Sequence, residues 1–236
     1  MEKSHLKIDR ISLQLSNCYL LTGRRSVLVD CGCQSDWTFL EKSLSQRGVE
    51  IGSLAAVILT HVHFDHCGCA AFLQAEGVPV IASVSAEASL SQGIQEGKSW
   101  LEHGSRLPVF GRLLSTHTRF QPVNVDFPVS SQLELSDFGI DGQVVLSGGH
   151  TQGSVSVVLD NRKACIGDLI MGGFLGLPPA WKPQFHPLNT NNQEALAQII
   201  SLRDAGVDQF FVGHGDTLMA RDIDHWIEGQ IRLSKQ

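Results

Sequence analysis

The chain has 236 residues, of which 42% are hydrophobic and 18% are charged, and its formal net charge is −6. This length provides a substantial core for one large domain or two small ones, and the composition is that of a globular protein, which excludes a disordered chain. The acidic balance disfavours nucleic acid as a partner, because a polyanion is bound mainly through Lys and Arg.

The N-terminal stretch MEKSHLKIDRISLQL contains neither the apolar region nor the cleavage site of a signal peptide. No apolar run approaches the roughly 20 residues that span a bilayer, so we expect a cytoplasmic protein with no membrane partner. Four of the six cysteines form two Cys-Gly-Cys pairs, a spacing that differs from the Cys-x-x-Cys of zinc and redox motifs. We interpret all six as reduced, structural thiols.

Strand-like and helix-like segments alternate along the first part of the chain. The segments that read as strands are 6–13, 16–22, 26–32, 54–60 and 78–83. The segments that read as helices are 36–48 and 69–77, and each of them ends at a glycine. From about 86 to 130, scattered prolines and weak periodicity predict an irregular insertion.

The second part of the chain repeats this alternation without an intervening linker. Its predicted strands are 143–149, 154–159, 163–168 and 207–215, its predicted helices are 191–206 and 221–233, and a loop rich in Gly and Pro covers 171–187. Two successive blocks of strands and helices favour a single layered α/β domain with the helices outside the sheets.

The segment AVILTHVHFDHCG places four potential metal ligands directly after a buried strand: His61, His63, Asp65 and His66. In open α/β sheets, ligands bind beyond the carboxyl ends of the strands. Imidazole and carboxylate groups together suit Zn²⁺, Fe²⁺ or Mn²⁺. Four groups exceed what one closed zinc site takes from so short a loop, so we expect them to face two different metals.

Three further strands end in a glycine followed by a potential ligand, namely His150, Asp168 and His214. Glycine permits a sharp turn and a close approach of the backbone to a site. One such residue alone would be an ordinary surface histidine or a helix cap, but the repeated pattern favours a metal centre. The histidines outside this pattern are interpreted as surface residues: His5, His103, His117 and His225.

The motif THVHFDHCG resembles the His-x-His-x-Asp-His signature of the metallo-β-lactamase superfamily, and LVDCG, GGHTQGS, IGD and VGHG match its other elements in order, over about 17–215. The resemblance implies a four-layer αββα sandwich, with two mixed β-sheets and helices on the outer faces. We expect one such domain over 1–236, with the insertion at about 86–130 covering the metal edge.

The resemblance also implies a dinuclear site that holds two divalent metal ions, zinc being expected and iron or manganese being alternatives. By motif position, the first metal would be bound by His61, His63 and His150, and the second by Asp65, His66 and His214. Asp168 would bridge the two metals, and Asp30 would orient a ligand by a hydrogen bond. Asp65 and Asp168 are the expected catalytic residues.

Two such cations can hold a bridging hydroxide of lowered pKa, which would attack a small ester, thioester or lactone. An aspartate at position 168, where true β-lactamases of this family usually carry Cys or Ser, favours this class, although phosphodiesters and β-lactams stay open. The core motifs resemble those of glyoxalase II, but only 22 residues follow His214, so its C-terminal domain is not expected. Tyr19 lies in an early strand, which makes it a doubtful counterpart of the lactonase tyrosine.

A mononuclear iron persulfide dioxygenase of the same fold is the alternative from another reaction class. The substrate is expected to be a small molecule, held between the insertion and the loop 171–187. Phe174, Trp181 and Phe185 in this loop are predicted apolar contacts for it. His186 could be a pocket acid or an extra ligand, but we interpret it as a surface histidine.

Overall fold

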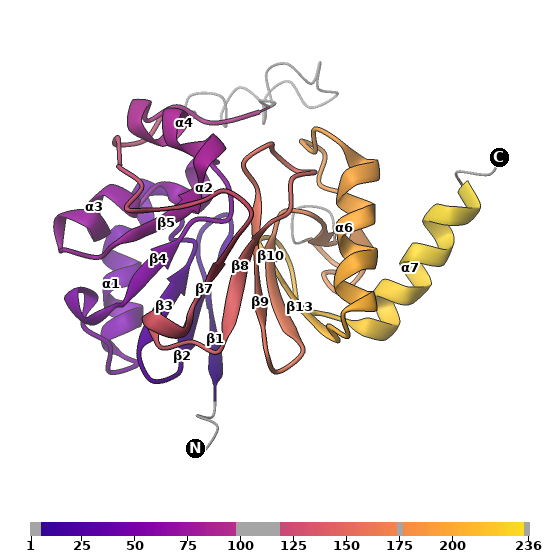
Figure 1. Ribbon diagram of the computed structural model, residues 1–236, viewed down its shortest axis with the longest axis horizontal. Helices are drawn as coiled ribbons and strands as arrows, with labels where there is room; N and C mark the ends of the chain where they lie inside the picture. The colour runs from indigo at the N-terminus through magenta and orange to yellow at the C-terminus, as the bar shows by residue number, and fades with distance from the viewer. Residues whose placement is uncertain (1–5, 98–118, 174–176, 234–236) are drawn as a thin grey trace.

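The computed structural model describes residues 6–97, 119–173 and 177–233, and it contains two six-stranded sheets (Figure 1). The strands of the first sheet lie side by side in chain order: β1 (Lys7–Ser12), β2 (Asn17–Thr22), β3 (Ser26–Val29), β4 (Ala56–Ile58), β5 (Val80–Ser83) and β6 (Phe127–Val129). The first three strands pair antiparallel, whereas β3 to β6 run parallel.

The second sheet has the order β14-β13-β10-β9-β8-β7. Its strands are β7 (Gln132–Glu134), β8 (Gly142–Leu146), β9 (Val155–Leu159), β10 (Lys163–Gly167), β13 (Gln209–Val212) and β14 (Leu218–Met219). The β10–β13 pair is parallel and the other described pairs are antiparallel, so this sheet is mixed as well. A short ribbon of β11 (Met171–Gly172) and β12 (Pro183–Gln184) lies within the predicted loop 171–187.

Helices cover the outer face of each sheet (Figure 1). On the first sheet these include α1 (Trp37–Ser45) and α3 (Ala70–Ala75), with the short α2 (Phe64–Cys67) and α4 (Glu87–Gln92) nearby. On the second sheet they are α6 (Asn192–Asp204) and α7 (Ala220–Leu233). Three separate apolar clusters fill the spaces between these layers, which confirms the predicted four-layer sandwich.

Burial on both faces explains why the inner strands appear as continuous apolar runs in the sequence. In β10, Ala164 and Ile166 belong to the cluster under α6 and α7, whereas Cys165 points into the cluster between the sheets. In β13, Phe210 and Phe211 divide between the same two clusters. Parallel strands covered on both sides have this composition, because neither face needs polar residues.

Every predicted strand and helix has a counterpart in the structure, usually with shorter bounds. The segment 86–130 is not irregular throughout, because it contains α4 and contributes β6 to the first sheet. The sequence also did not reveal β7 and β14, which have three and two residues. His5, His103 and His117 lie outside the described residues.

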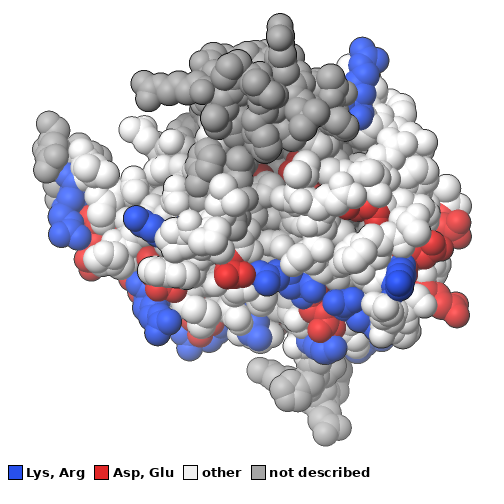
Figure 2. Space-filling model, turned by 180° about the vertical axis from the view of Figure 1, so that it is seen from behind, with Lys and Arg blue, Asp and Glu red and all other residues white. Residues whose placement is uncertain are grey.

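Within the described ranges, no helix combines the length and the hydropathy needed to cross a lipid bilayer. Basic and acidic side chains lie intermixed on the face of the molecule seen in Figure 2. That nucleic acid is not a partner stays a prediction.

Candidate metal centre

The seven predicted ligands come together where strands of both sheets end. His61 and His63 follow β4, and Asp65 and His66 lie on α2, which begins at Phe64. The second sheet contributes the other three after β8, β10 and β13, respectively: His150, Asp168 and His214. All of them are at most 6% exposed except Asp65, whose side chain is 13% exposed.

Four side chains form the first ligand group: His61, His63, His150 and Asp168. Nδ1 of His63 lies 3.1 Å from Nε2 of His61 and 3.1 Å from Nε2 of His150. Oδ2 of Asp168 lies 3.6 Å from Nε2 of His61 and 3.7 Å from Nε2 of His150. Ligands of a tetrahedral zinc with bonds of about 2.05 Å are roughly 3.3 Å apart, so this spacing fits one metal ion.

The second group is Asp65, His66 and His214. Oδ2 of Asp65 lies 3.7 Å from Nε2 of His66 and 3.6 Å from Nε2 of His214. Oδ2 of Asp168 lies 3.4 Å from His66 Nε2 and 3.2 Å from His214 Nε2. The same carboxylate oxygen therefore borders both groups, which is the position of a bridging ligand.

Hydrogen bonds on the far side of each of the five imidazole rings set which nitrogen faces the centre. In the first group, His61 Nδ1 donates to Thr60 Oγ1 at 3.0 Å, His63 Nε2 to the Glu96 carbonyl at 3.2 Å, and His150 Nδ1 to Asn189 Oδ1 at 2.8 Å. In the second group, His66 Nδ1 donates to Asp30 Oδ2 and His214 Nδ1 to the Leu15 carbonyl, each at 2.8 Å. Thr60 Oγ1 acts as an acceptor because its own proton is donated to Asp30. In each neutral ring, the nitrogen that faces the centre is therefore an unprotonated lone pair.

Lone pairs that face one another at 3.1 Å repel unless a proton or a cation lies between them. Nε2 of His66 and both carboxylate oxygens of Asp168 are also buried without a hydrogen-bond partner among the described residues. Such atoms are costly to bury unpaired. A divalent cation in each group would pair the facing imidazole nitrogens and Oδ2 of Asp168, so these residues fit a metal.

The pKa shifts divide the site in two. Burial lowers the pKa of His63 to about 4 and that of His150 to about 3, which keeps these two imidazoles neutral and ready for a metal. Burial alone would raise the pKa of Asp168, but the imidazoles of His214 and His66 hold it well below its ordinary value. Burial opposes protonation of His214, yet Asp168 raises its pKa. In the metal-free protein, protons therefore compete for the second group.

Asp30 holds the ends of two segments together behind the centre. Its Oδ1 accepts a hydrogen bond from the Thr60 backbone N–H at 2.7 Å, and its Oδ2 accepts bonds from Thr60 Oγ1 and His66 Nδ1, each at 2.8 Å. The expected hydrogen bond between Asp30 and a ligand is thus present, with His66 as the donor.

The interpretation of His186 as a surface histidine is wrong. The residue is 4% exposed, and its Nε2 lies 3.7 Å from Oδ2 of Asp168. Its ring lies 4.7 Å from that of His150 and stacks on that of His214 at 5.5 Å. The segment between β12 and α6 turns inward here, a tertiary arrangement without a local signal in the sequence.

Two supporting residues were also missed, Glu96 and Asn189. Besides its carbonyl contact to His63, Glu96 accepts hydrogen bonds from Thr151 Oγ1 at 3.0 Å and from the Gly153 backbone N–H at 3.1 Å. Glu96 therefore connects the two halves of the first ligand group. The only sequence signal was its position within the insertion that was expected to lie over this edge.

All six cysteines are free and buried, as expected of structural thiols. The two Cys-Gly-Cys segments lie against each other: the Cys31 backbone N–H donates to the carbonyl of His66 at 2.8 Å, and that of Gly68 donates to Gly32 at 2.8 Å. The Cys69 thiol donates to the Cys33 carbonyl at 2.9 Å. Burial raises the pKa of Cys69 to about 12, so the thiol stays protonated and supports the backbone behind α2.

The predicted apolar contacts of the loop 171–187 have different outcomes. Phe185 packs against Trp226 of α7 at 4.9 Å between ring centroids, so it belongs to the core and not to a pocket wall. Trp181 is 58% exposed, and Phe174 lies outside the described residues. Tyr19 is buried and its hydroxyl donates to the Val212 carbonyl at 2.7 Å, which occupies it away from catalysis.

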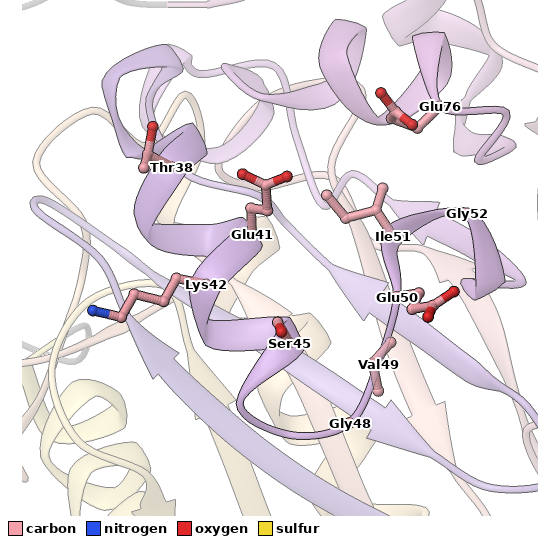
Figure 3. A pocket seen from close by; sticks show the side chains of 10 residues that line it. All are labelled: Thr38, Glu41, Lys42, Ser45, Gly48, Val49, Glu50, Ile51, Gly52 and Glu76. Carbon is pink, nitrogen blue, oxygen red and sulfur yellow. The ribbon is translucent and has the colours of Figure 1, made fainter.

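An aromatic pocket lies beside α2. It is lined by Cys33, Gln34, Ser35, Trp37, Phe64, Phe72, Arg119 and Phe120. Phe64 stands between two ligands in the chain, and Arg119 and Phe120 come from the predicted insertion. A second pocket, between α1 and the segment 48–52, contains carboxylates but no residue of the metal centre (Figure 3).

A four-layer sandwich with two histidine–aspartate groups at one edge indicates a metal-dependent hydrolase. The family model of the metallo-β-lactamase superfamily matches residues 12–214, and the chain belongs to this superfamily. A probable metallo-hydrolase of Methanocaldococcus jannaschii is 25% identical over 203 residues, which cover 85% of this chain and 88% of the relative.

Two solved structures have the same fold. A metallo-β-lactamase family protein from Thermus thermophilus has a TM-score of 0.64 at 22% identity, with 100% of this chain and 80% of that one covered. An archaeal metallo-β-lactamase superfamily protein from Sulfolobus tokodaii has a TM-score of 0.64 at 16% identity, with 95% and 86% covered.

Proposed function

We propose that this protein is a dinuclear hydrolase that cleaves small esters, thioesters or lactones, with zinc as its metal. The observation that carries the proposal is that two ligand groups share Oδ2 of Asp168. Two cations held there would supply a water of lowered pKa and a Lewis acid for the carbonyl oxygen. The first cation would be held by His61, His63 and His150, and the second by Asp65, His66 and His214, with Asp168 between them.

The residues of the chain have distinct parts in this proposal. The negative charge of Asp168 would offset the repulsion between two cations held by these groups. Asp65 is the most exposed ligand, so its carboxylate would accept a hydrogen bond from the attacking water on the side open to substrate. The hydrogen bonds that His66 and His150 donate to Asp30 and Asn189 hold the two rings in their orientations.

Two observations favour carbonyl substrates of modest polarity. Position 168 carries the aspartate that resembles the ester and thioester hydrolases of the superfamily and not the Cys or Ser of its β-lactamases. The pocket beside α2 has four aromatic side chains in its wall, Trp37, Phe64, Phe72 and Phe120. Such a wall suits the apolar acyl or alkyl chain of a substrate.

The proposal is tested by metal analysis and a substrate panel on one preparation of zinc-loaded protein. The panel contains thioesters, lactones, phosphodiesters, β-lactams and a persulfide. We expect about two zinc ions per chain and turnover of a thioester or a lactone. His63→Ala and His214→Ala should each lower that turnover by orders of magnitude, whereas His225→Ala, at an exposed position on α7, should not.

Other outcomes would identify another member of the superfamily. One iron per chain with oxygen uptake driven by the persulfide would make the protein a dioxygenase. A strong preference for phosphodiesters or β-lactams, with two metals bound, would support the dinuclear centre but contradict esters, thioesters and lactones as the substrate class.

A further inference from the structure

His186 is buried at the metal centre and belongs to neither predicted ligand set. Its Nε2 lies 3.7 Å from Oδ2 of Asp168, at the same distance as Nε2 of His150. By distance alone, it could complete a third ligand group with Asp168 and His214. The hydrogen bond at its other ring nitrogen, however, indicates that His186 is not a metal ligand.

The backbone N–H of Leu188 donates a hydrogen bond to Nδ1 of His186 at 3.2 Å. Nδ1 is therefore an unprotonated acceptor, and the neutral ring carries its proton on Nε2, the nitrogen that faces Asp168. The five ligand histidines have the reverse arrangement, because their far nitrogens donate and their facing nitrogens are lone pairs. A nitrogen that carries a proton cannot bind a metal.

We propose that His186 is a catalytic hydrogen-bond donor whose Nε2–H binds the carbonyl oxygen of the substrate. This inference rests on the proposed hydrolase function and narrows it to substrates in which a carbonyl oxygen becomes negatively charged. The donor binds the oxygen without giving up its proton.

The chemical step shows where this donor acts. The oxygen of the attacking hydroxide forms a bond to the acyl carbon, and the π electron pair of the carbonyl moves onto its oxygen. The Nε2–H of His186 stabilises that charge. The pair then returns to re-form the carbonyl, and the bond to the alkoxide or thiolate leaving group breaks. The proton of the attacking hydroxide passes to that leaving group, so the products are a carboxylate and an alcohol or thiol. A preoriented donor of this kind typically contributes about 10²–10³-fold to turnover.

The surroundings keep this donor in place. The ring of His186 lies edge-on to that of His150 and stacks on that of His214 at an interplanar angle of 23°. Its carbonyl accepts the backbone N–H of Asn189 at 3.0 Å, and Asn189 in turn orients His150. The turn from His186 to Asn189 thus positions both the donor His186 and the ligand His150.

Three substitutions separate a donor from a ligand. In His186→Gln the side-chain amide can place an N–H near the position of Nε2, whereas in His186→Asn it reaches only the position of Nδ1, and His186→Ala removes both. For the zinc-loaded protein and the best substrate of the panel, we expect unchanged zinc content in all three variants. Turnover should fall about 100-fold or more in His186→Ala and His186→Asn and recover in part in His186→Gln. His225→Gln is the matched control at an exposed histidine.

A second measurement reads the ring itself and needs no substrate. Long-range ¹H–¹⁵N NMR of histidine-labelled, zinc-loaded protein distinguishes the two tautomers, and the resonances that disappear in His186→Gln assign this residue. We expect the proton of His186 on Nε2. A zinc-bound Nε2, or loss of zinc in the variants, would make it a ligand and overturn the proposal, as would full turnover in His186→Ala. If wild-type protein with two zinc ions hydrolyses no carbonyl substrate, the proposed function fails, whereas the NMR result still decides the tautomer.

Discussion

Asp30 adopts a left-handed backbone conformation, with φ of 59°, immediately after β3. Asn and Asp tolerate this conformation better than other residues with side chains. The turn directs the carboxylate back toward Thr60 and His66, where three donors converge on two oxygens. A single residue thus joins the conformation of one strand end to the orientation of a ligand.

Asp30→Asn keeps the backbone preference and the shape but directs an amide at donors. Its Nδ2 is a donor and accepts neither the bond from Thr60 Oγ1 nor the bond from His66 Nδ1, so His66 loses its orientation. We expect zinc affinity at the second site to fall about 10–100-fold, measured by competition with a chelator. Asp141→Asn, which alters only an ion pair with Arg24 at the surface, should leave zinc affinity unchanged. Equal affinity in both variants would contradict this account of Asp30.

The pKa shifts of His63 and His150 predict that the stability of the metal-free protein depends on pH. Burial lowers both pKa values, to about 4 and about 3, below the value of about 6.5 for an unfolded chain. As pH falls below about 6.5, the unfolded chain binds protons that these folded residues do not bind, so their contribution to stability is lost on acidification. The pKa of His214 is raised, so this residue changes the stability in the opposite direction as the pH falls. The effect of one histidine is therefore measured by comparing variants.

We therefore compare the Tm of metal-free wild type with that of His150→Asn at about pH 7.5 and about pH 5. The variant lacks one imidazole that must stay neutral, so it should lose less Tm between the two conditions than the wild type does. An equal or larger loss would show that His150 does not oppose protonation in the folded state.

At the scale of secondary structure, Gly213, which directly follows β13, shows how closely the backbone approaches the ligand side chains. A Cβ on Gly213 would lie 2.1 Å from Oδ1 of Asp168 and 2.6 Å from Cε1 of His66. The backbone N–H of Gly213 also donates to the Gly167 carbonyl at 2.9 Å, which aligns the ends of β10 and β13. Any side chain here would displace ligands from both sheets.

Gly213→Ala should therefore abolish binding of the second metal ion while the protein stays folded. Gly229→Ala is the control, because a Cβ at that position in α7 meets no atom within 4 Å. It should leave zinc content unchanged and raise stability by about 0.5–1 kcal/mol, since Ala is the better helix former. Metal content and Tm of both variants check this, and full zinc content in Gly213→Ala would refute the close-contact argument.

The same scale shows what the sequence could predict. The inner strands were predictable because burial on both faces leaves an unbroken apolar run, as in β4, and the glycine–ligand pattern then marked their ends. The short strands β6, β7 and β14 at the sheet margins are only partly buried and leave no such run. His186 and Asn189 were not predicted because their position depends on how a loop folds over the centre and not on a local pattern.

At the scale of the whole molecule, the metal centre connects the two sheets. His61, His63, Asp65 and His66 follow the first sheet, whereas His150, Asp168 and His214 follow the second. Metal bound only by the folded protein stabilises it by about 4 kcal/mol at a free concentration 1,000 times the Kd. Metal would therefore hold the halves of the sandwich together at this edge.

Removing the metal with a chelator should lower the Tm by several degrees, and adding zinc back should restore it. Hydrogen exchange should then rise at the ligand-bearing ends of β4, β8, β10 and β13 and stay unchanged at their opposite ends. Uniformly increased exchange across both sheets, or none at all, would contradict the view of the metal as a local clamp.

The central claim, that one carboxylate joins two metal sites, is tested most directly by the zinc content per chain of wild type and Asp168→Asn, measured by elemental analysis on matched preparations. Asn keeps the shape of the side chain but removes the charge between the two groups. The account predicts about two zinc ions in wild type and about one in the variant, because His61, His63 and His150 still hold the first. Two zinc ions in both proteins, or only one in wild type, would contradict it.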